Sequence, residues 1–164
     1  SSADLARLVA LNVTAVTVLA HAAGRRFAGA GQGTIVNIGS VVGLAPEFGL
    51  AVYGGTKAYV LHFTQALQGE FGPKGVYVQA VLPAATRTEI WKKSGRDPEG
   101  MPGLMEVDDL VDAALVGFDR REPVTIPPLP EAAPFEAYEA ARRAMLPGFG
   151  NAKPGARYRA AEPA

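Results

Sequence analysis

The sequence predicts an α/β fold built on a parallel sheet, and three observations support this. Short apolar, β-branched segments of strand length occur at Thr34–Ile38, Val76–Leu82 and Val124–Ile126. Longer stretches with the 3.6-residue period of amphipathic helices lie between and around them. The middle segment is apolar at most positions instead of alternating, which is typical of a strand covered on both faces.

Each predicted helix rests on the spacing of its apolar residues. The first, Asp4–Ala23, places one apolar stripe along its length, made of Leu5, Leu8, Val9, Val16 and Leu19. The other three predicted helices are Val52–Phe71, Val107–Phe118 and Glu131–Leu146. Each of the last two predicted strands is therefore preceded by a helix, as in an open α/β sheet.

Composition and charge exclude several classes of protein. The 164 residues are 48% hydrophobic and carry 16 basic and 16 acidic side chains, so the chain offers no broad basic field for nucleic acid. No cysteine is present, which excludes disulfides and thiolate sites and suits a reducing cytoplasm. No uninterrupted apolar run of bilayer length and no basic-then-apolar leader stand out. We therefore expect a cytoplasmic protein without a membrane partner.

The candidate chemistry lies where a predicted strand, a loop and a helix follow one another. The strand ends at Gly39–Ser40, which places Ser40 at the carboxyl end of a strand, where open α/β sheets hold their ligands. Tyr53 and Lys57 fall in the first turns of the next helix, four residues apart and therefore on one face. The sequence thus predicts that a hydroxyl, a phenol and an ammonium converge at one edge of the sheet.

These groups suit proton transfer at an alcohol or a carbonyl. A phenol is a weak general base at neutral pH, but a neighbouring ammonium favours the phenolate. At a separation of about 4 Å the attraction is about 1 kcal/mol in water and about 4 kcal/mol at an effective dielectric of ~20, so the site must exclude water. Tyr53 would then exchange a proton with the substrate oxygen that Ser40 binds. With no cysteine and no visible metal-ligand cluster, the electron pair leaves as hydride to an organic cofactor.

Ser40, twelve intervening residues and then Tyr53-x-x-x-Lys57, after the strand sequence IVNIGS, resemble the active-site signature of the short-chain dehydrogenase/reductase family. The resemblance implies a partial doubly wound, Rossmann-type parallel sheet, of which this chain holds the last three strands with flanking helices. It also implies NAD or NADP as cofactor and Tyr53 as general acid and base.

Asn12 has three interpretations. From the residues alone, a polar side chain on this helix is a hydrogen-bonded core asparagine or marks a helix irregularity. The resemblance favours a third role, because Asn12 is similar to the family's asparagine that completes a Ser/Tyr/Lys/Asn proton relay. His21 and His62 fall outside this group, and we expect them at the surface or in packing contacts.

The resemblance also implies a cofactor site after the second strand. Val76–Leu82 and Pro83 resemble the strand and proline that abut the nicotinamide in the family, and Thr88 matches a threonine that contacts its carboxamide. The family usually has Pro-Gly where this chain has Pro83–Ala84, and alanine adds a methyl group and restricts φ, so we expect the turn to differ slightly. The cofactor-binding residues so implied are Tyr53, Lys57, Pro83, Ala84, Thr86 and Thr88.

The resemblance covers roughly the C-terminal three-fifths of such a domain. The family holds the pyrophosphate with a Gly-rich turn after its first strand, whereas the glycines from Gly29 to Gly33 follow a helix and enter a strand, which predicts a linker. We therefore expect a partial chain that lacks the N-terminal Gly-rich unit. Residues 1–146 would form the catalytic part of one domain and 147–164 a loosely ordered tail. By itself such a piece would expose a strand edge and be poorly stable, so activity of the piece alone is not expected.

A Gly- and Pro-rich stretch, Ala84–Met105, predicts a long loop. It either folds over substrate as a lid that excludes water or forms an ordinary surface insertion. Trp91 and Met101 would accordingly line a pocket or cover the core.

The prediction for function is an NAD(P)-dependent oxidoreductase that interconverts a small-molecule alcohol and a carbonyl compound, without a metal. Its catalytic residues are Asn12, Ser40, Tyr53 and Lys57. In the family, the helices that match Asp4–Ala23 and Val52–Phe71 commonly form subunit contacts, which implies a homodimer or homotetramer. Two alternatives stay open: a non-catalytic, truncated interaction or oligomerisation module, and an epimerase or dehydratase of the same fold.

Overall fold

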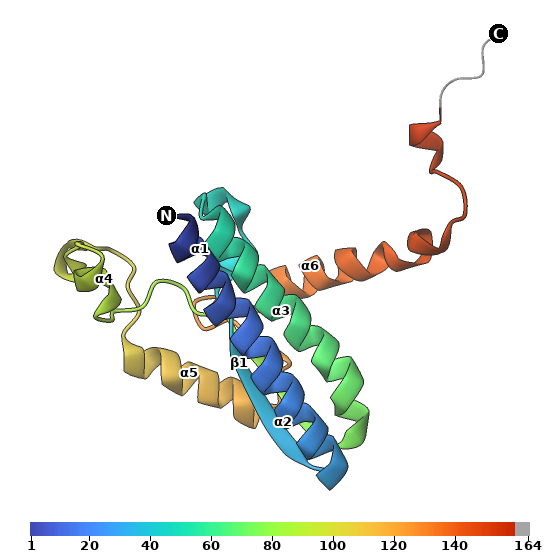
Figure 1. Cartoon of the computed structure of the whole chain (residues 1–164), viewed down its shortest axis with the longest axis horizontal. Helices are drawn as coiled ribbons and strands as arrows, with labels where there is room; N and C mark the ends of the chain where they lie inside the picture. Colours follow the sequence, from blue (N-terminus) through green and yellow to red (C-terminus); the bar gives the residue numbers. More distant parts are fainter. Residues whose placement is uncertain (160–164) are drawn as a thin grey trace. The chain divides into compact units, whose positions relative to one another are not determined.

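The computed structural model describes residues 1–159, in two compact units that divide after Pro128. The first unit holds the sheet and its helices (Figure 1). The second, from Leu129 onward, holds helix α6 (Ala133–Ala144) and single 3₁₀ turns at Leu146–Gly150 and Ala156–Tyr158. The boundary at 146 stays a prediction, and residues 160–164 of the predicted tail lie outside the described residues.

The sheet in residues 1–159 has three parallel strands in the order β1 (Gly33–Ile38), β2 (Val76–Val81) and β3 (Val124–Thr125). The predicted α/β class and parallel sheet are therefore confirmed, with each strand within one residue of its predicted ends. The helices of the first unit are α1 (Ser2–Val9), a π-helical turn (Ala10–Ala15), α2 (Val16–Ala30), α3 (Ala51–Phe71), the short α4 (Ile90–Lys93) and α5 (Val107–Asp119).

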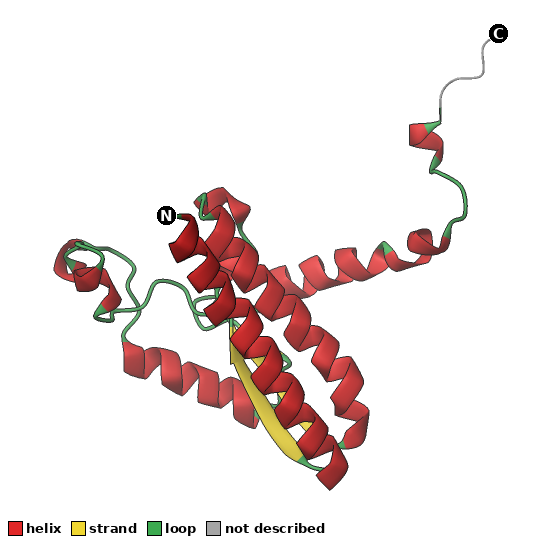
Figure 2. Ribbon diagram, in the orientation of Figure 1, coloured by secondary structure: helices red, strands yellow, loops and turns green. Residues whose placement is uncertain are grey.

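Helices cover both faces of β2, as in a doubly wound sheet. On one face α2 and α3 lie side by side (Figures 1 and 2) and share a buried core made of Ala20, Ile35, Leu67, Phe71, Val76 and Val78. On the other face α5 covers β2: the ring of Tyr77 meets that of Phe118 edge-on at 5.5 Å, and Gln79 Nε2 donates to Ala114 O. This two-sided burial explains why the β2 sequence lacks polar alternation.

Strand β1 is one of the two edge strands of the sheet in the described part of the chain. Its Ile35 and Asn37 are buried on the α3 side, where Asn37 Nδ2 donates to Thr64 Oγ1 at 3.0 Å. On the opposite face Val36 and Ile38 are 42% and 55% exposed. The predicted unpaired edge therefore carries an uncovered apolar face as well.

The first helix is longer than predicted and turned differently. α1, the π turn and α2 form one continuous helix from Ser2 to Ala30. A π turn adds a residue per turn and so changes which side chains face inward. Consequently Leu19 is 71% exposed, while Ala20 and Gly24 are buried. The predicted stripe is therefore only partly right: Leu8 and Val16 are half-buried, whereas Leu5, Val9 and Leu19 are exposed.

The same helix corrects the expectation that no segment is long and apolar enough to span a bilayer. Its most apolar window has a mean hydropathy of 1.6 and is only 6% buried, so length and composition alone would allow it to cross a membrane. The sequence interpretation missed it because Asn12, Thr14 and His21 interrupt the apolar run. One such helix is weak evidence, since an exposed apolar helix is also typical of a protein interface.

The close packing of α2 on α3 depends on Gly24. A Cβ there would lie 2.2 Å from a ring carbon of Phe71, so we expect Gly24→Ala to lower the free energy of unfolding by about 1–3 kcal/mol. Gly29 lies in the same helix, and a Cβ there would meet no atom within 4 Å, so Gly29→Ala should raise that free energy by about 0.5–1 kcal/mol. Urea denaturation of both variants measures the difference, and equal effects would contradict this packing.

Candidate active site

Ser40 lies two residues after the end of β1, and its loop is hydrogen-bonded to the segment that follows β2. Its Oγ donates to Pro83 O at 3.2 Å and accepts from the N–H of Val42 at 3.2 Å. The N–H of Val41 donates to the same Pro83 carbonyl at 3.0 Å. Ser40 is only 6% exposed. These contacts hold Ser40 against Pro83, because β1 and β2 are parallel and end at the same edge of the sheet.

Tyr53 and Lys57 lie in the first two turns of α3. Lys57 Nζ donates to the carbonyl of Ile38, the last residue of β1, at 3.1 Å and lies 5.8 Å from the centroid of the Tyr53 ring. Both side chains are half-buried. The structure therefore brings Lys57 to the strand end that leads into Ser40, with the Tyr53 ring beside it.

Burial lowers the pKa of Lys57 from its ordinary value of 10.5, because a half-buried ammonium loses hydration that favours the charged form. Between that lowered pKa and 10.5 the unfolded chain binds more protons than the folded one. The contribution of Lys57 to the free energy of unfolding therefore rises with pH in that window and is constant above it.

We expect this contribution to disappear in Lys57→Met. The difference in unfolding free energy, wild type minus variant, should become more favourable to the wild type as pH rises through the alkaline range toward 10.5. Denaturant titrations of the natural full-length protein at several alkaline pH values measure it, with Lys92→Met as the control for losing an exposed positive charge. If this difference in unfolding free energy did not change with pH, burial at this site would not destabilise the charged form of Lys57.

Asn12 lies within the π turn and is hydrogen-bonded to α3. Its Nδ2 donates to Thr56 Oγ1 at 3.0 Å, and Thr56 Oγ1 donates to Tyr53 O at 2.7 Å. Both features expected from the residues alone, a hydrogen-bonded asparagine and a helix irregularity, are therefore present. Thr56 is a link that sequence reasoning missed, although its place inside the Tyr-x-x-x-Lys spacing puts it next to Lys57.

The other predicted cofactor residues follow β2 and are spread along the chain. Pro83 is half-buried and contacts Ser40 as described, whereas Thr86 Oγ1 donates back to Ala84 O at 3.1 Å. Thr88 is exposed just before α4. The structure thus joins Pro83 to the Ser40 loop and places the two threonines at the start of the next segment.

The histidines that we left out of the site, His21 and His62, are exposed.

An apolar pocket of about 460 Å³ opens beside this group. Its wall is formed by the loop after Ser40 and by small residues of α3: Val42, Gly43, Ala45, Pro46, Gly49, Leu50, Ala51, Gly54, Gly55 and Ala58. Gly43 allows the loop to approach α3, since a Cβ there would lie 2.7 Å from the Ala58 nitrogen. The side chains of Ser40, Tyr53 and Lys57 are not part of its wall, so the pocket is a neighbour of the group and not its centre.

Comparison with known proteins now identifies the family. Residues 1–99 match the model of the family described as short chain dehydrogenase. The chain belongs to this family. The family match begins at residue 1, so the predicted lack of an N-terminal Gly-rich unit stays a prediction.

Two solved structures are similar over nearly the whole chain. A short-chain dehydrogenase from Sphingobium yanoikuyae in complex with NADPH is 57% identical, with a TM-score of 0.92 over 97% of this chain and 62% of its own. The bulky-bulky ketone specific alcohol dehydrogenase from Comamonas testosteroni is 52% identical, with a TM-score of 0.87 over 96% of this chain and 60% of its own.

The curated relatives match a smaller part of this chain than the two solved structures do. The short-chain dehydrogenase RED1 of Pyricularia oryzae is 35% identical over 96 residues, which are 58% of this chain and 34% of the relative. The very-long-chain 3-oxoacyl-CoA reductase-A of Danio rerio is 34% identical over 85 residues, which are 52% of this chain and 27% of the relative. The matches thus span about a third of the first curated relative and about a quarter of the second, while the chain covers about three-fifths of the two solved structures.

Proposed function

We propose that the natural full-length protein is an NAD(P)-dependent oxidoreductase that interconverts a small-molecule alcohol and a carbonyl compound. The observation that carries this proposal is the position of Lys57, which reaches from α3 to the end of β1 with the Tyr53 ring 5.8 Å from its Nζ. Ser40 begins the loop at the same strand end. The solved Sphingobium relative, which is in complex with NADPH, supports the choice of cofactor.

The residues present fit a nicotinamide nucleotide. The ammonium of Lys57 carries three protons, and its bond to Ile38 O uses one, so the others can serve the ribose hydroxyls. Pro83 would offer apolar surface to the nicotinamide ring, with Ala84 in the same turn, and the hydroxyls of Thr86 and Thr88 would meet its polar groups. When bound, the nicotinamide supplies or accepts the hydride at the substrate carbon.

In the direction of reduction, the protein's own residues handle the oxygen of the carbonyl group. Tyr53 donates its phenolic proton to that oxygen as the alkoxide forms, so the O–H bond of the phenol breaks and that of the alcohol forms. Ser40 turns its proton from Pro83 O to the same oxygen and holds it in place. Lys57 stabilises the phenolate left on Tyr53. Asn12 supports the path that returns a proton to Tyr53. Thr56 links the two residues, since its hydroxyl accepts from Asn12 Nδ2 and donates to Tyr53 O.

The substrate class we propose is a ketone with bulky apolar groups. The apolar pocket shares the loop after Ser40, and Gly54 in its wall adjoins Tyr53. Its small side chains leave room for a bulky substituent next to the reacting carbon. The name of the Comamonas relative, a ketone-specific alcohol dehydrogenase, supports the same class.

Two further proposals concern the protein's surroundings. The apolar side chains of Leu11, Val18 and Leu19 are 61–71% exposed on the first helix, which supports a homodimer or homotetramer built on this surface. The absence of cysteine in the sequence supports a cytoplasmic location.

Cofactor turnover tests the proposed function. The natural full-length protein should oxidise NADPH or NADH in the presence of a ketone with two bulky substituents, one mole per mole of alcohol formed. Interconversion of epimers or loss of water without net loss of reduced cofactor would indicate the epimerase or dehydratase instead. Failure of a nicotinamide fluorescence titration to show any binding would favour the interaction module.

A further inference from the structure

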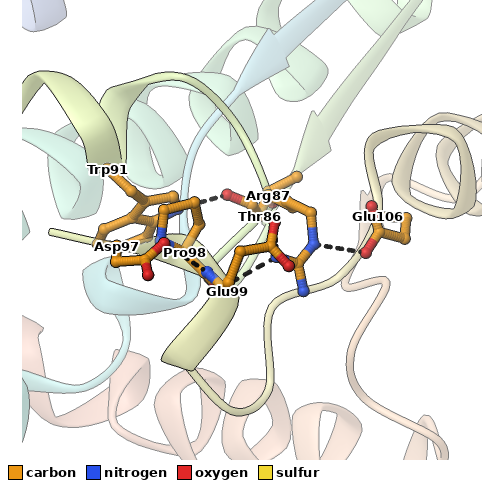
Figure 3. A network of polar contacts seen from close by, with 7 residues as sticks. All are labelled: Thr86, Arg87, Trp91, Asp97, Pro98, Glu99 and Glu106. Atoms are coloured by element: carbon orange, nitrogen blue, oxygen red, sulfur yellow. Dashed lines mark hydrogen bonds and ion pairs between the residues drawn. The ribbon is translucent and has the colours of Figure 1, made fainter.

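A polar network at the base of the segment between β2 and α5 plays no part in the mechanism above. Arg87 is its centre (Figure 3). Its Nε donates to Glu106 Oε1 at 2.7 Å, and its Nη1 donates to Pro98 O at 3.1 Å and lies 3.8 Å from Glu99 Oε1. Figure 3 shows the guanidinium between the two glutamates, so one side chain joins three points that are up to 19 residues away in the sequence.

The backbone closes at the same place. Thr86 and Met105 form a parallel bridge, in which Arg87 N–H donates to Met105 O at 2.8 Å and Met105 N–H donates to Ala85 O at 3.0 Å. Residues 87–104, here called the lid loop, therefore leave and return through one stem. Two backbone hydrogen bonds make a short stem, and Arg87 reinforces it from the side.

The inside of the lid loop is tied to this stem as well. Trp91 Nε1 donates to Thr86 O at 2.7 Å, and Arg96 N–H donates to Trp91 O at 2.9 Å. Pro98, whose carbonyl accepts from Arg87, is buried although both its neighbours are exposed. The lid loop is thus compact, and its contacts converge on Thr86 and Arg87.

Arg87 lies between the two threonines that would contact the nicotinamide. In strand-like backbone such as the Thr86 bridge, consecutive side chains point to opposite sides. Anchoring Arg87 to Glu106 and Pro98 therefore fixes the side of the backbone to which the Thr86 side chain points. It also fixes the backbone position from which the chain continues to Thr88. An unanchored Arg87 would let the stem rotate and open.

We propose that Arg87 is a positioning residue, which clamps the lid loop at its stem and holds Thr86 and Thr88 toward the cofactor. This rests on the proposed function, because it assumes that a nicotinamide nucleotide binds at Pro83. The clamp acts on binding and not on chemistry: it touches neither Tyr53 nor Ser40. Arg87 is 33% exposed and Glu106 57% exposed, so solvent partly screens their attraction and the effect is of moderate size.

Steady-state kinetics of the natural full-length protein separate binding from chemistry. Arg87→Met should raise KM for NADPH and for the ketone about three- to tenfold and leave kcat within about twofold. Arg87→Lys should recover part of the loss, since a lysine keeps the charge without the guanidinium fork. Glu106→Gln should act in the same direction, whereas Glu89→Gln is the matched control, because Glu89 pairs with Lys93 inside the lid loop and not at its stem.

Trypsin supplies a readout that does not need turnover. Lys92, Lys93 and Arg96 are exposed cleavage sites within the lid loop. We expect Arg87→Met to be cut there about tenfold faster than the wild type at an unchanged Tm, and Glu89→Gln to be cut at the wild-type rate.

The outcomes are distinguishable. If the wild type neither binds nor consumes NADPH, the proposed function fails, and the positioning role fails with it. If the wild type is active but Arg87→Met keeps its KM values, the positioning role is overturned, whether cleavage accelerates or not. A loss confined to kcat would also overturn it.

Discussion

Replacing Tyr53 by phenylalanine should lower kcat for ketone reduction by about 10²–10⁴-fold and leave the Kd for NADPH within about threefold of the wild type. The variant keeps the ring that lies beside Lys57 Nζ but lacks the proton that the substrate oxygen must receive. Steady-state kinetics give kcat, and nicotinamide fluorescence on titration gives Kd.

Tyr59→Phe is the matched control on the same helix. The Tyr59 hydroxyl is hydrogen-bonded to Thr17 of α2, so its loss should lower the free energy of unfolding by about 1 kcal/mol and leave kcat unchanged. Comparable kcat values for Tyr53→Phe and the wild type would remove Tyr53 from the mechanism. Equal losses in both variants would point to damage of α3 instead of lost chemistry.

Replacing Ser40 by alanine should lower kcat by about 10²–10³-fold, the usual cost of removing one hydrogen-bond donor from a reacting oxygen. The change also leaves the Val42 N–H without the acceptor that caps its 3₁₀ turn, so a loss of stability of about 1 kcal/mol should accompany it. Kinetics and urea denaturation of the same preparation measure the two effects.

Thr64→Val separates these effects. Thr64 is buried, and its hydroxyl also makes two hydrogen bonds, to Asn37 Nδ2 and to Val60 O, but it lies along α3 away from the strand end. This variant should lose as much stability as Ser40→Ala and keep its kcat. If both variants lost activity in proportion to stability, Ser40 would have a structural role only.

Much of the fold follows from local patterns. The three strands were predictable because short β-branched runs bounded by helical periods have few other solutions in an α/β chain. Tyr53 and Lys57 share a face of α3 for the same reason, since four residues make about one turn. Ser40 at the end of β1 follows from the length of the strand alone.

Other features depend on contacts between distant segments, which a single sequence does not register. The π turn at Ala10–Ala15 rotates the remainder of the first helix and exposes Leu19; Asn12 indicated an irregularity there but not the form that it takes. Thr56 and Arg87 were missed because their partners, Asn12 and Glu106, lie 44 and 19 residues away. The apolar length of the first helix was underestimated because its polar residues were counted as breaks.

A crystal structure of the natural full-length protein with NADPH and a non-reacting ketone analogue tests the central claim most directly. We predict that the Tyr53 hydroxyl and Ser40 Oγ both lie within hydrogen-bond distance of the analogue's oxygen, with Lys57 Nζ on the nicotinamide ribose. A complex in which the two hydroxyls face different sides, or in which Lys57 Nζ points to bulk solvent, would contradict the account.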